Sequence, residues 1–202
     1  MMNNLDRIYS SNIQNFSRDY LGYLSSIFEN INNESIESFI KLIIKKRNNN
    51  KNIFFIGNGG SASTASHFAN DISIGTRSFK KPFKAYSLCD NQAILTALGN
   101  DYGFEKIFVN QLKNYAQRED LVIAISASGN SPNLIEAINY SNQNNIDTFS
   151  LTAFDGGKLK GLANGNIHVP TELTEYGPAE DIHMIIAGMA GSYLIRYVKS
   201  EH

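Results

Sequence analysis

From residue 52 onward, short apolar runs alternate with segments long enough to form helices. The apolar runs are NIFFIG at 52–57, KAYSL at 84–88, LVIAIS at 121–126, DTFSL at 147–151 and NIHVP at 166–170. Runs of this length suit strands, and helix-length connections between strands are typical of parallel sheets. Helices cover both faces of such a sheet, so its strands can be apolar throughout. We therefore predict an α/β fold with a parallel sheet.

Helices are expected at both ends of the chain. Residues 12–48 contain two stretches with apolar residues at helical spacing, and residues 178–199 read as one long helix with Pro178 in its first turn. The basic cluster KKRNNNK at 45–51 suits a helix end, where cations are favoured by the helix dipole. We expect it to be solvated; a nucleic-acid patch is the alternative.

Charge and composition exclude several classes of protein. The 202 residues carry a formal net charge of −1, which gives no general attraction to nucleic acid or to anionic membranes. No apolar run is long enough to span a bilayer, and MMNNLDRIYSSN lacks the apolar core of a signal peptide. The single cysteine, Cys89, excludes an internal disulfide. These features predict a soluble cytoplasmic protein that binds neither nucleic acid nor membrane.

Two junctions between an expected strand and the following helix are rich in glycine, serine and asparagine. They are GNGGSAS at 57–63 and SASGNSPN at 126–133. In parallel α/β sheets, ligands bind where strands end and helices begin. Glycines allow the backbone to approach a ligand closely, and serine hydroxyls and helix N–H groups donate to anionic oxygens. Neither junction is a P-loop or a dinucleotide-binding loop, because the required lysine and GxGxxG spacing are missing.

The second junction is the better candidate for a phosphate site. Ser126, Ser128 and Ser131 can all point into one turn, and Pro132 then begins the helix whose N-terminus would face the anion. An ordinary capped turn is the alternative for either junction taken alone. Two such turns on one sheet favour a ligand site.

Together these motifs resemble the SIS (sugar isomerase) domain family, and most closely its phosphoheptose isomerases. The likeness rests on the order and spacing of GNGGSAS, HFA, LTALGNDYGFE, ISASGNSPN and LTAFDGGK, and it extends from the N-terminal helices to about residue 199. It implies a five-stranded parallel sheet of flavodoxin-like type and a single SIS domain over 1–202. Residues 1–50 would be a helical oligomerisation extension, and the protein a homotetramer with its sites at subunit interfaces.

The resemblance also implies an activity. Phosphoheptose isomerases convert sedoheptulose 7-phosphate to D-glycero-D-manno-heptose 7-phosphate through an enediol, in heptose biosynthesis for lipopolysaccharide or capsule. One group removes a carbon-bound proton, and another transfers the proton on the neighbouring oxygen. No cofactor is required, although some members bind zinc. Matched motif by motif, the substrate-binding residues would be Ser126, Ala127, Ser128 and Ser131 at the phosphate, with Asn58, Gly59, Gly60, Ser61, Asn100 and Asp101 at the sugar.

Three positions depart from the family pattern. Asp71 replaces the glutamate of the HFAxEL motif, Glu180 replaces a glutamine, and Gly188 replaces a histidine that is an acid/base group and metal ligand. His67 and Asp71 are four residues apart, on one helical face. We predict a rearranged catalytic site in which Asp71 and Glu180 form a carboxylate pair with His67 as third member, because close carboxylates separate their pKa values.

The same three side chains, His67, Asp71 and Glu180, form a possible zinc-ligand set. Two functions without catalysis are the alternatives, since the family's histidine is replaced by Gly188. One is a regulator that only binds a phosphosugar, and the other is a protein-interaction module.

Several remaining residues have two interpretations. Gly188 and Gly191 present a bare helix face, which would allow either close helix packing or an enlarged pocket. His183 lies one turn after Glu180 and could reach the site or lie in the core. In FDGGK at 154–158, we expect the glycines to serve the backbone rather than a ligand.

Overall fold

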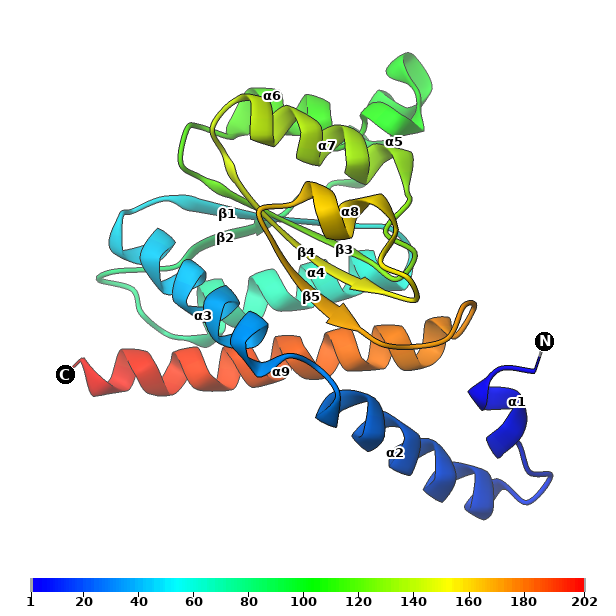
Figure 1. Ribbon diagram of the computed structural model, residues 1–202. Coiled ribbons are helices and arrows are strands. Elements are labelled where there is room, and N and C mark those ends of the chain that lie inside the picture. Colours follow the sequence, from blue (N-terminus) through cyan, green and yellow to red (C-terminus); the bar gives the residue numbers. More distant parts are fainter. Residues whose placement is uncertain (1, 202) are drawn as a thin grey trace.

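A computed structural model describes residues 2–201, which form a five-stranded parallel sheet between layers of helices (Figure 1). The strands are β1 (Asn52–Gly57), β2 (Lys84–Ser87), β3 (Leu121–Ser126), β4 (Asp147–Ala153) and β5 (Gly165–Val169). Their order in the sheet is β2-β1-β3-β4-β5, and every neighbouring pair is parallel. This is the flavodoxin-like order, so the predicted fold class is confirmed. Each apolar run predicted to be a strand forms one.

Helices connect the strands and precede the sheet. They are α1 (Asn4–Ile8), α2 (Ile13–Glu29), α3 (Asn33–Asn48), α4 (Gly60–Asn70), α5 (Gln92–Tyr102), α6 (Val109–Tyr115), α7 (Pro132–Gln143), α8 (Gly157–Leu162) and α9 (Tyr176–Ser200). A π-helical turn, η1 (Asp71–Gly75), continues α4, and a 3₁₀ turn, η2 (Phe104–Lys106), follows α5. None of the helices within residues 2–201 has the length and apolar character needed to cross a membrane.

Alternate residues of each strand enter two separate cores. Ile53 and Phe55 of β1 pack on the face covered by α3, α4 and α9, whereas Phe54 and Ile56 pack on the face covered by α6, α7 and α8 (Figure 1). Side chains alternate between faces with a period of two, so a strand buried on both sides is expected to be mainly apolar on both. Residues 53–57 of β1, which follow the half-buried Asn52, fit this expectation.

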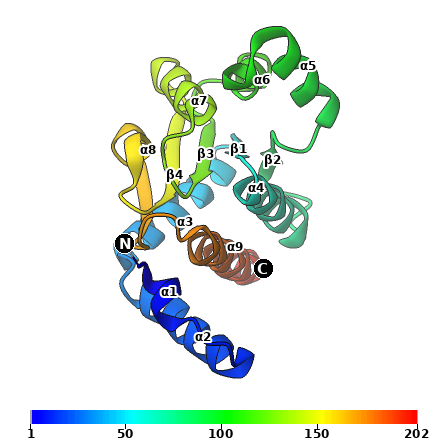
Figure 2. The same cartoon turned by 90° about the vertical axis from the view of Figure 1, so that its right-hand side faces the viewer.

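The N-terminal helices lie outside the sheet layers and contact the start of α9 (Figure 2). Tyr20 of α2 donates a hydrogen bond to the Asp181 carboxylate at 2.5 Å. The buried Glu175 carboxylate accepts from the Leu5 amide at 3.1 Å and from the Tyr23 hydroxyl at 2.5 Å. The short helix α1, which the sequence did not predict, is thereby anchored to the segment that leads into α9.

The basic cluster at residues 45–51 was predicted to be solvated, and this prediction is wrong for Lys46 and Arg47, which are buried. Lys46 is 2% exposed, and its Nζ donates to the Glu119 carbonyl and to Asp147 Oδ2, both at 2.6 Å. Arg47 is 3% exposed and pairs with Glu201. Burial of a charge is tolerated when a counter-charge and hydrogen-bond acceptors replace water, and here distant segments supply them.

Candidate functional site

A pocket of about 160 Å³ lies at the carboxyl end of the sheet, where β1 and β3 end side by side. The residues that line it are Asn58, Ser61, Ile125, Ser126, Ala127, Ser128, Ser131, Tyr176 and Glu180. They come from the two predicted loops and from the first turns of α9. The loops meet because β1 and β3 are adjacent parallel strands, with Gly57 opposite Ile125.

The second loop presents hydroxyl groups to this pocket. Ser126 Oγ accepts a hydrogen bond from the Gly129 amide at 3.1 Å, and Ser128 Oγ accepts from the Asn130 amide at 3.3 Å. A serine hydroxyl that accepts a bond still has its own proton to donate. Ser131 is the N-cap of α7, and its side chain makes no capping bond. Three hydroxyl groups and the N-terminus of α7 therefore face one small volume, an arrangement that suits an anion.

Glycines support this loop from behind, as predicted for FDGGK. Gly129 has φ +62°, and a Cβ there would lie 2.0 Å from the Gly156 carbonyl oxygen. A Cβ on Gly157 would lie 2.3 Å from the Ser128 carbonyl oxygen. The loops are further joined by a hydrogen bond of 3.0 Å from the Leu159 amide to the Gly129 carbonyl. Side chains at these glycines would separate two loops that pack backbone against backbone.

The first loop is tied to the second and is in contact with α9. Asn58 and Asn133 exchange two amide hydrogen bonds of 2.9 and 2.8 Å. Gly59 has φ +54° and begins the turn into α4. A Cβ on Gly60 would lie only 2.2 Å from Glu180 Oε2, so the Glu180 carboxylate rests directly against the backbone of the first loop. The absence of a side chain at position 60 therefore allows the Glu180 carboxylate to take this position.

The Glu180 carboxylate is suited to proton transfer. Burial raises its pKa above the usual range for glutamate, and the neighbouring Asp181 charge raises it further. A carboxyl group with a raised pKa in a pocket is a candidate general acid or base at neutral pH. Of the three predicted catalytic residues, Glu180 is the one that lines this pocket.

His67 and Asp71 pair with each other away from the pocket. His67 Nε2 lies 3.2 Å from Asp71 Oδ2, which agrees with the predicted shared helical face. Asp71 packs against Gly191 of α9, where a Cβ would lie 3.3 Å from Asp71 Cβ. Gly60, the first residue of α4, touches Glu180, whereas Asp71, eleven positions later, touches Gly191. At 1.5 Å per helical residue, Asp71 lies about 16 Å from the end of α4 that meets Glu180. One chain does not bring the predicted carboxylate pair together.

The same separation bears on the predicted zinc ligands. Across residues 2–201, no three or more His, Cys, Asp or Glu side chains are grouped so that they could hold a metal ion. His67, Asp71 and Glu180 therefore do not fit a zinc ion within a single chain.

Gly188 and Gly191 of α9 differ in their surroundings. At Gly191 the helix is closely packed, because a Cβ there would lie 3.3 Å from Asp71 Cβ. A Cβ on Gly188 would meet nothing within 4 Å, and Gly188 does not line the pocket.

Asn100 and Asp101 lie at the end of α5 and do not line the pocket. Asn100 Nδ2 donates to Asp101 Oδ1 at 2.8 Å, and both side chains are exposed. None of the residues of α5 is buried, although its sequence QAILTALGNDY is largely apolar. The sugar contacts predicted for this helix are thus not assembled within one chain.

His183 lies in the core rather than in the pocket. Its side chain is fully buried, and neither ring nitrogen has a hydrogen-bond partner among the described residues. Burial lowers its pKa to about 4, so the imidazole is neutral at pH 7. The core alternative for His183 is correct.

Sequence reasoning missed Tyr176 as a pocket residue. Tyr176 is half exposed and packs edge-on against Phe154, with 5.0 Å between the ring centroids. It precedes Glu180 by four residues in α9, so the two share a helical face. The spacing of four residues between Tyr176 and Glu180 could have indicated that both line the pocket. It was missed because the predicted helix began at residue 178, whereas α9 begins at Tyr176.

Comparisons with known proteins agree with this architecture. The model of the SIS domain matches residues 16–153. A phosphoheptose isomerase of Helicobacter pylori (strain P12) is 38% identical over 141 residues, which cover 70% of this chain and 73% of that protein. One from Leptospira biflexa (strain Patoc 1 / Ames) is 33% identical over 183 residues, or 90% of each protein.

Solved structures extend the similarity to the whole fold. A phosphoheptose isomerase from Neisseria gonorrhoeae superposes with a TM-score of 0.80 at 26% identity, covering 91% of this chain and 98% of that one. One from Francisella tularensis has the same TM-score at 23% identity and covers 94% of this chain and 100% of that one. At this identity the similarity shows a shared fold and no more.

Proposed function

The chain belongs to the SIS domain family, and from that premise we propose that it is a sugar-phosphate isomerase acting on a seven-carbon ketose phosphate. The proposed reaction converts sedoheptulose 7-phosphate to D-glycero-D-manno-heptose 7-phosphate. The observation that carries the proposal is the meeting of the serine loop, the glycine loop and Glu180 in one pocket. The resemblance to phosphoheptose isomerases supports the choice of substrate.

In the proposed complex, the serine loop holds the phosphate. Ser126, Ser128 and Ser131 donate their hydroxyl protons to phosphate oxygens, and the N-terminus of α7 adds a favourable dipole. The sugar then extends toward the first loop, where Asn58 and Ser61 line the pocket. The Asn58–Asn133 amide pair holds this loop at a constant distance from the phosphate.

In the proposed mechanism, Glu180 moves the carbon-bound proton. Its carboxylate takes the proton from the carbon beside the carbonyl, the C–H electron pair forms the enediol double bond, and the carbonyl oxygen takes a proton from water. The same carboxyl group then returns its proton to the former carbonyl carbon, while the hydroxyl on the neighbouring carbon gives its proton to water and becomes the new carbonyl. The raised pKa of Glu180 suits both halves of this transfer.

We propose that copies of the chain associate, as a homotetramer, to complete the site. Two groups of predicted site residues lie on the surface of one chain, outside the pocket: the His67–Asp71 pair and the Asn100–Asp101 pair. The apolar helix α5 without buried residues supports an additional contact there. A neighbouring copy can place either pair beside a pocket in which Glu180 is the one carboxylate among the described lining residues.

Proton exchange tests the proposal directly. Incubation with a panel of ketose phosphates in deuterated water should replace a carbon-bound hydrogen of sedoheptulose 7-phosphate, seen by NMR. Glu180→Gln should slow the exchange by roughly two to four orders of magnitude while phosphate binding is retained. Tight binding without exchange on any substrate would instead support a phosphosugar-binding regulator, the alternative favoured by the distance between Asp71 and Glu180 in one chain.

A further inference from the structure

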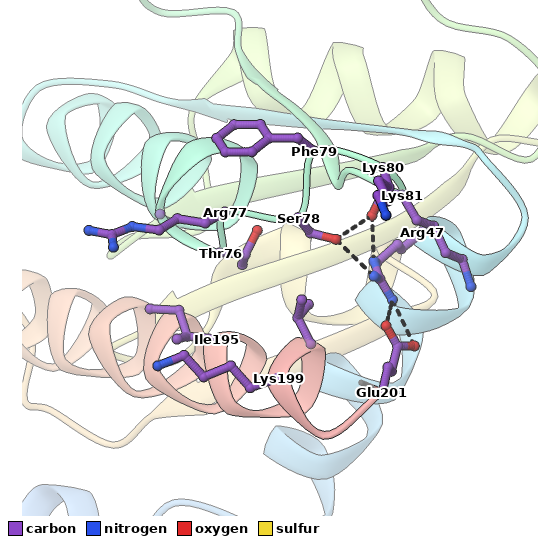
Figure 3. Close-up of a pocket in the computed structure, with 12 residues that line it drawn as sticks. Arg47, Thr76, Arg77, Ser78, Phe79, Lys80, Lys81, Ile195, Lys199 and Glu201 are labelled. Carbon is purple, nitrogen blue, oxygen red and sulfur yellow. Dashed lines mark hydrogen bonds and ion pairs between the residues drawn. The ribbon is translucent and has the colours of Figure 1, made fainter.

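A second hollow, of about 1060 Å³, lies at the opposite end of the sheet from the serine loop. It is formed by residues 75–81, which lead into the amino end of β2, and by the last turns of α9 (Figure 3). None of the residues assigned above to phosphate binding or proton transfer lines it. We refer to this hollow as the basic groove.

The base of the basic groove is rigidly built around Arg47. This buried guanidinium donates to the Lys81 carbonyl and to Ser78 Oγ, each at 2.9 Å, and pairs with Glu201 at 2.8 Å (Figure 3). The ring of Phe83 lies 5.0 Å from it. A buried charge with this many partners holds the segment 78–81 and the end of α9 at a defined separation.

The rim of the groove has an excess of positive charge. Arg77, Lys80 and Lys199 are exposed cations on the rim, and Figure 3 shows Arg77 and Lys199 extending along the same side of the hollow. Glu201 is the one carboxylate among the described residues that line it, and that charge is already paired with Arg47. Arg77 and Lys199, two exposed cations on one side of the hollow without a local counter-charge, form a field that attracts anions.

The backbone presents Arg77 in a strained conformation. Its φ of +53° lies in the left-handed region, which is unfavourable for a residue with a Cβ. Its neighbours Thr76 and Ser78 are buried, and the Arg77 amide donates to the Ile74 carbonyl at 3.0 Å. Arg77 thus follows the end of the π-helical segment, and its side chain is exposed.

An aromatic ring lies beside these cations. The Phe79 side chain is 74% exposed at the rim, and Ile195 and Val198 of α9 form part of the wall. A large exposed ring gives a flat apolar surface on which a planar group can stack. The groove thus combines cations for phosphate groups with a surface for a ring.

We propose that the basic groove binds a phosphorylated ligand with a planar ring, of the nucleoside diphosphate class. The phosphates lie between Arg77 and Lys199, and the ring stacks on Phe79. A phosphorylated ligand without a ring uses the same cations, so the two kinds of ligand must be separated by experiment.

Calorimetry on the full chain with ADP, inorganic pyrophosphate and adenosine tests this proposal. ADP should bind, pyrophosphate should bind more weakly, and adenosine should show no measurable affinity. Arg77→Gln combined with Lys199→Gln should raise the dissociation constant for ADP at least tenfold, and added salt should weaken ADP binding. Phe79→Ala should weaken the binding of ADP but not that of pyrophosphate.

Matched variants separate this site from the rest of the protein. Arg18→Gln combined with Lys41→Gln removes the same two charge types from exposed positions elsewhere and should leave ADP affinity unchanged. Ser126→Ala combined with Ser128→Ala should also leave it unchanged, because those residues line the other pocket. The proposal is overturned if ADP does not bind at millimolar concentration, if the Arg77 and Lys199 changes have no effect, or if the serine changes abolish binding.

Discussion

Replacing Gly60 with alanine should separate the activity of the pocket from the stability of the fold. The new Cβ would lie 2.2 Å from Glu180 Oε2 and 2.5 Å from Cδ, so the carboxylate must move by about 1 Å to reach an ordinary contact distance. The Glu180 side chain is only partly buried and can move without disturbing the core. Alanine is also favoured over glycine in helices, by up to about 1 kcal/mol.

A displacement of about 1 Å in a proton-transfer group can cost on the order of a hundredfold in rate. We therefore expect Gly60→Ala to lower kcat/KM about a hundredfold and to change the free energy of unfolding by less than about 1 kcal/mol. Proton exchange by NMR measures the first, and urea unfolding the second. Gly188→Ala is the matched control: its Cβ meets nothing within 4 Å, so activity should be unchanged.

A double variant tests whether the effect passes through Glu180. If Gly60→Ala acts by moving the carboxylate, adding it to Glu180→Gln should cause little further loss, because both changes remove the same function. A wild-type rate for Gly60→Ala, or losses that add fully in the double variant, would refute the role of Glu180 in proton transfer.

Three other predictions concern the serine loop and the core. Changing Ser126 and Ser128 to alanine should weaken sugar-phosphate binding by about 1.5–3 kcal/mol per lost bond with folding intact; unchanged affinity by calorimetry would contradict the phosphate site. Gly129→Ala should destabilise the fold by more than about 1–2 kcal/mol, because φ is +62° and the new Cβ would lie 2.0 Å from the Gly156 oxygen; chemical unfolding would show this. His183 has a folded pKa of about 4, below its unfolded value of 6.5, so its contribution to stability is lost as pH falls from about 6.5 to 4. His183→Leu should flatten that part of the stability–pH curve, and an unaltered slope would contradict neutral burial.

The sequence by itself determined the sheet and the two loops. In LVIAIS, the first five residues are apolar because β3 is buried on both faces, and that pattern is local to the strand. The glycine and serine loops were recognisable for the same reason, since turn chemistry depends on neighbouring residues. Pro132 at the start of α7 is another local signal that held.

Only the tertiary structure decided which side chains meet. Spacing along the chain placed His67 beside Asp71, but it could not show that Glu180 rests on Gly60 while Asp71 packs on Gly191. Those contacts depend on how α4 and α9 lie against each other, which no local pattern encodes. The same holds for Arg47, whose burial requires acceptors from segments far away in the sequence. Local periodicity thus specifies elements, whereas the composition of a site follows from the packing of elements that are distant in the chain.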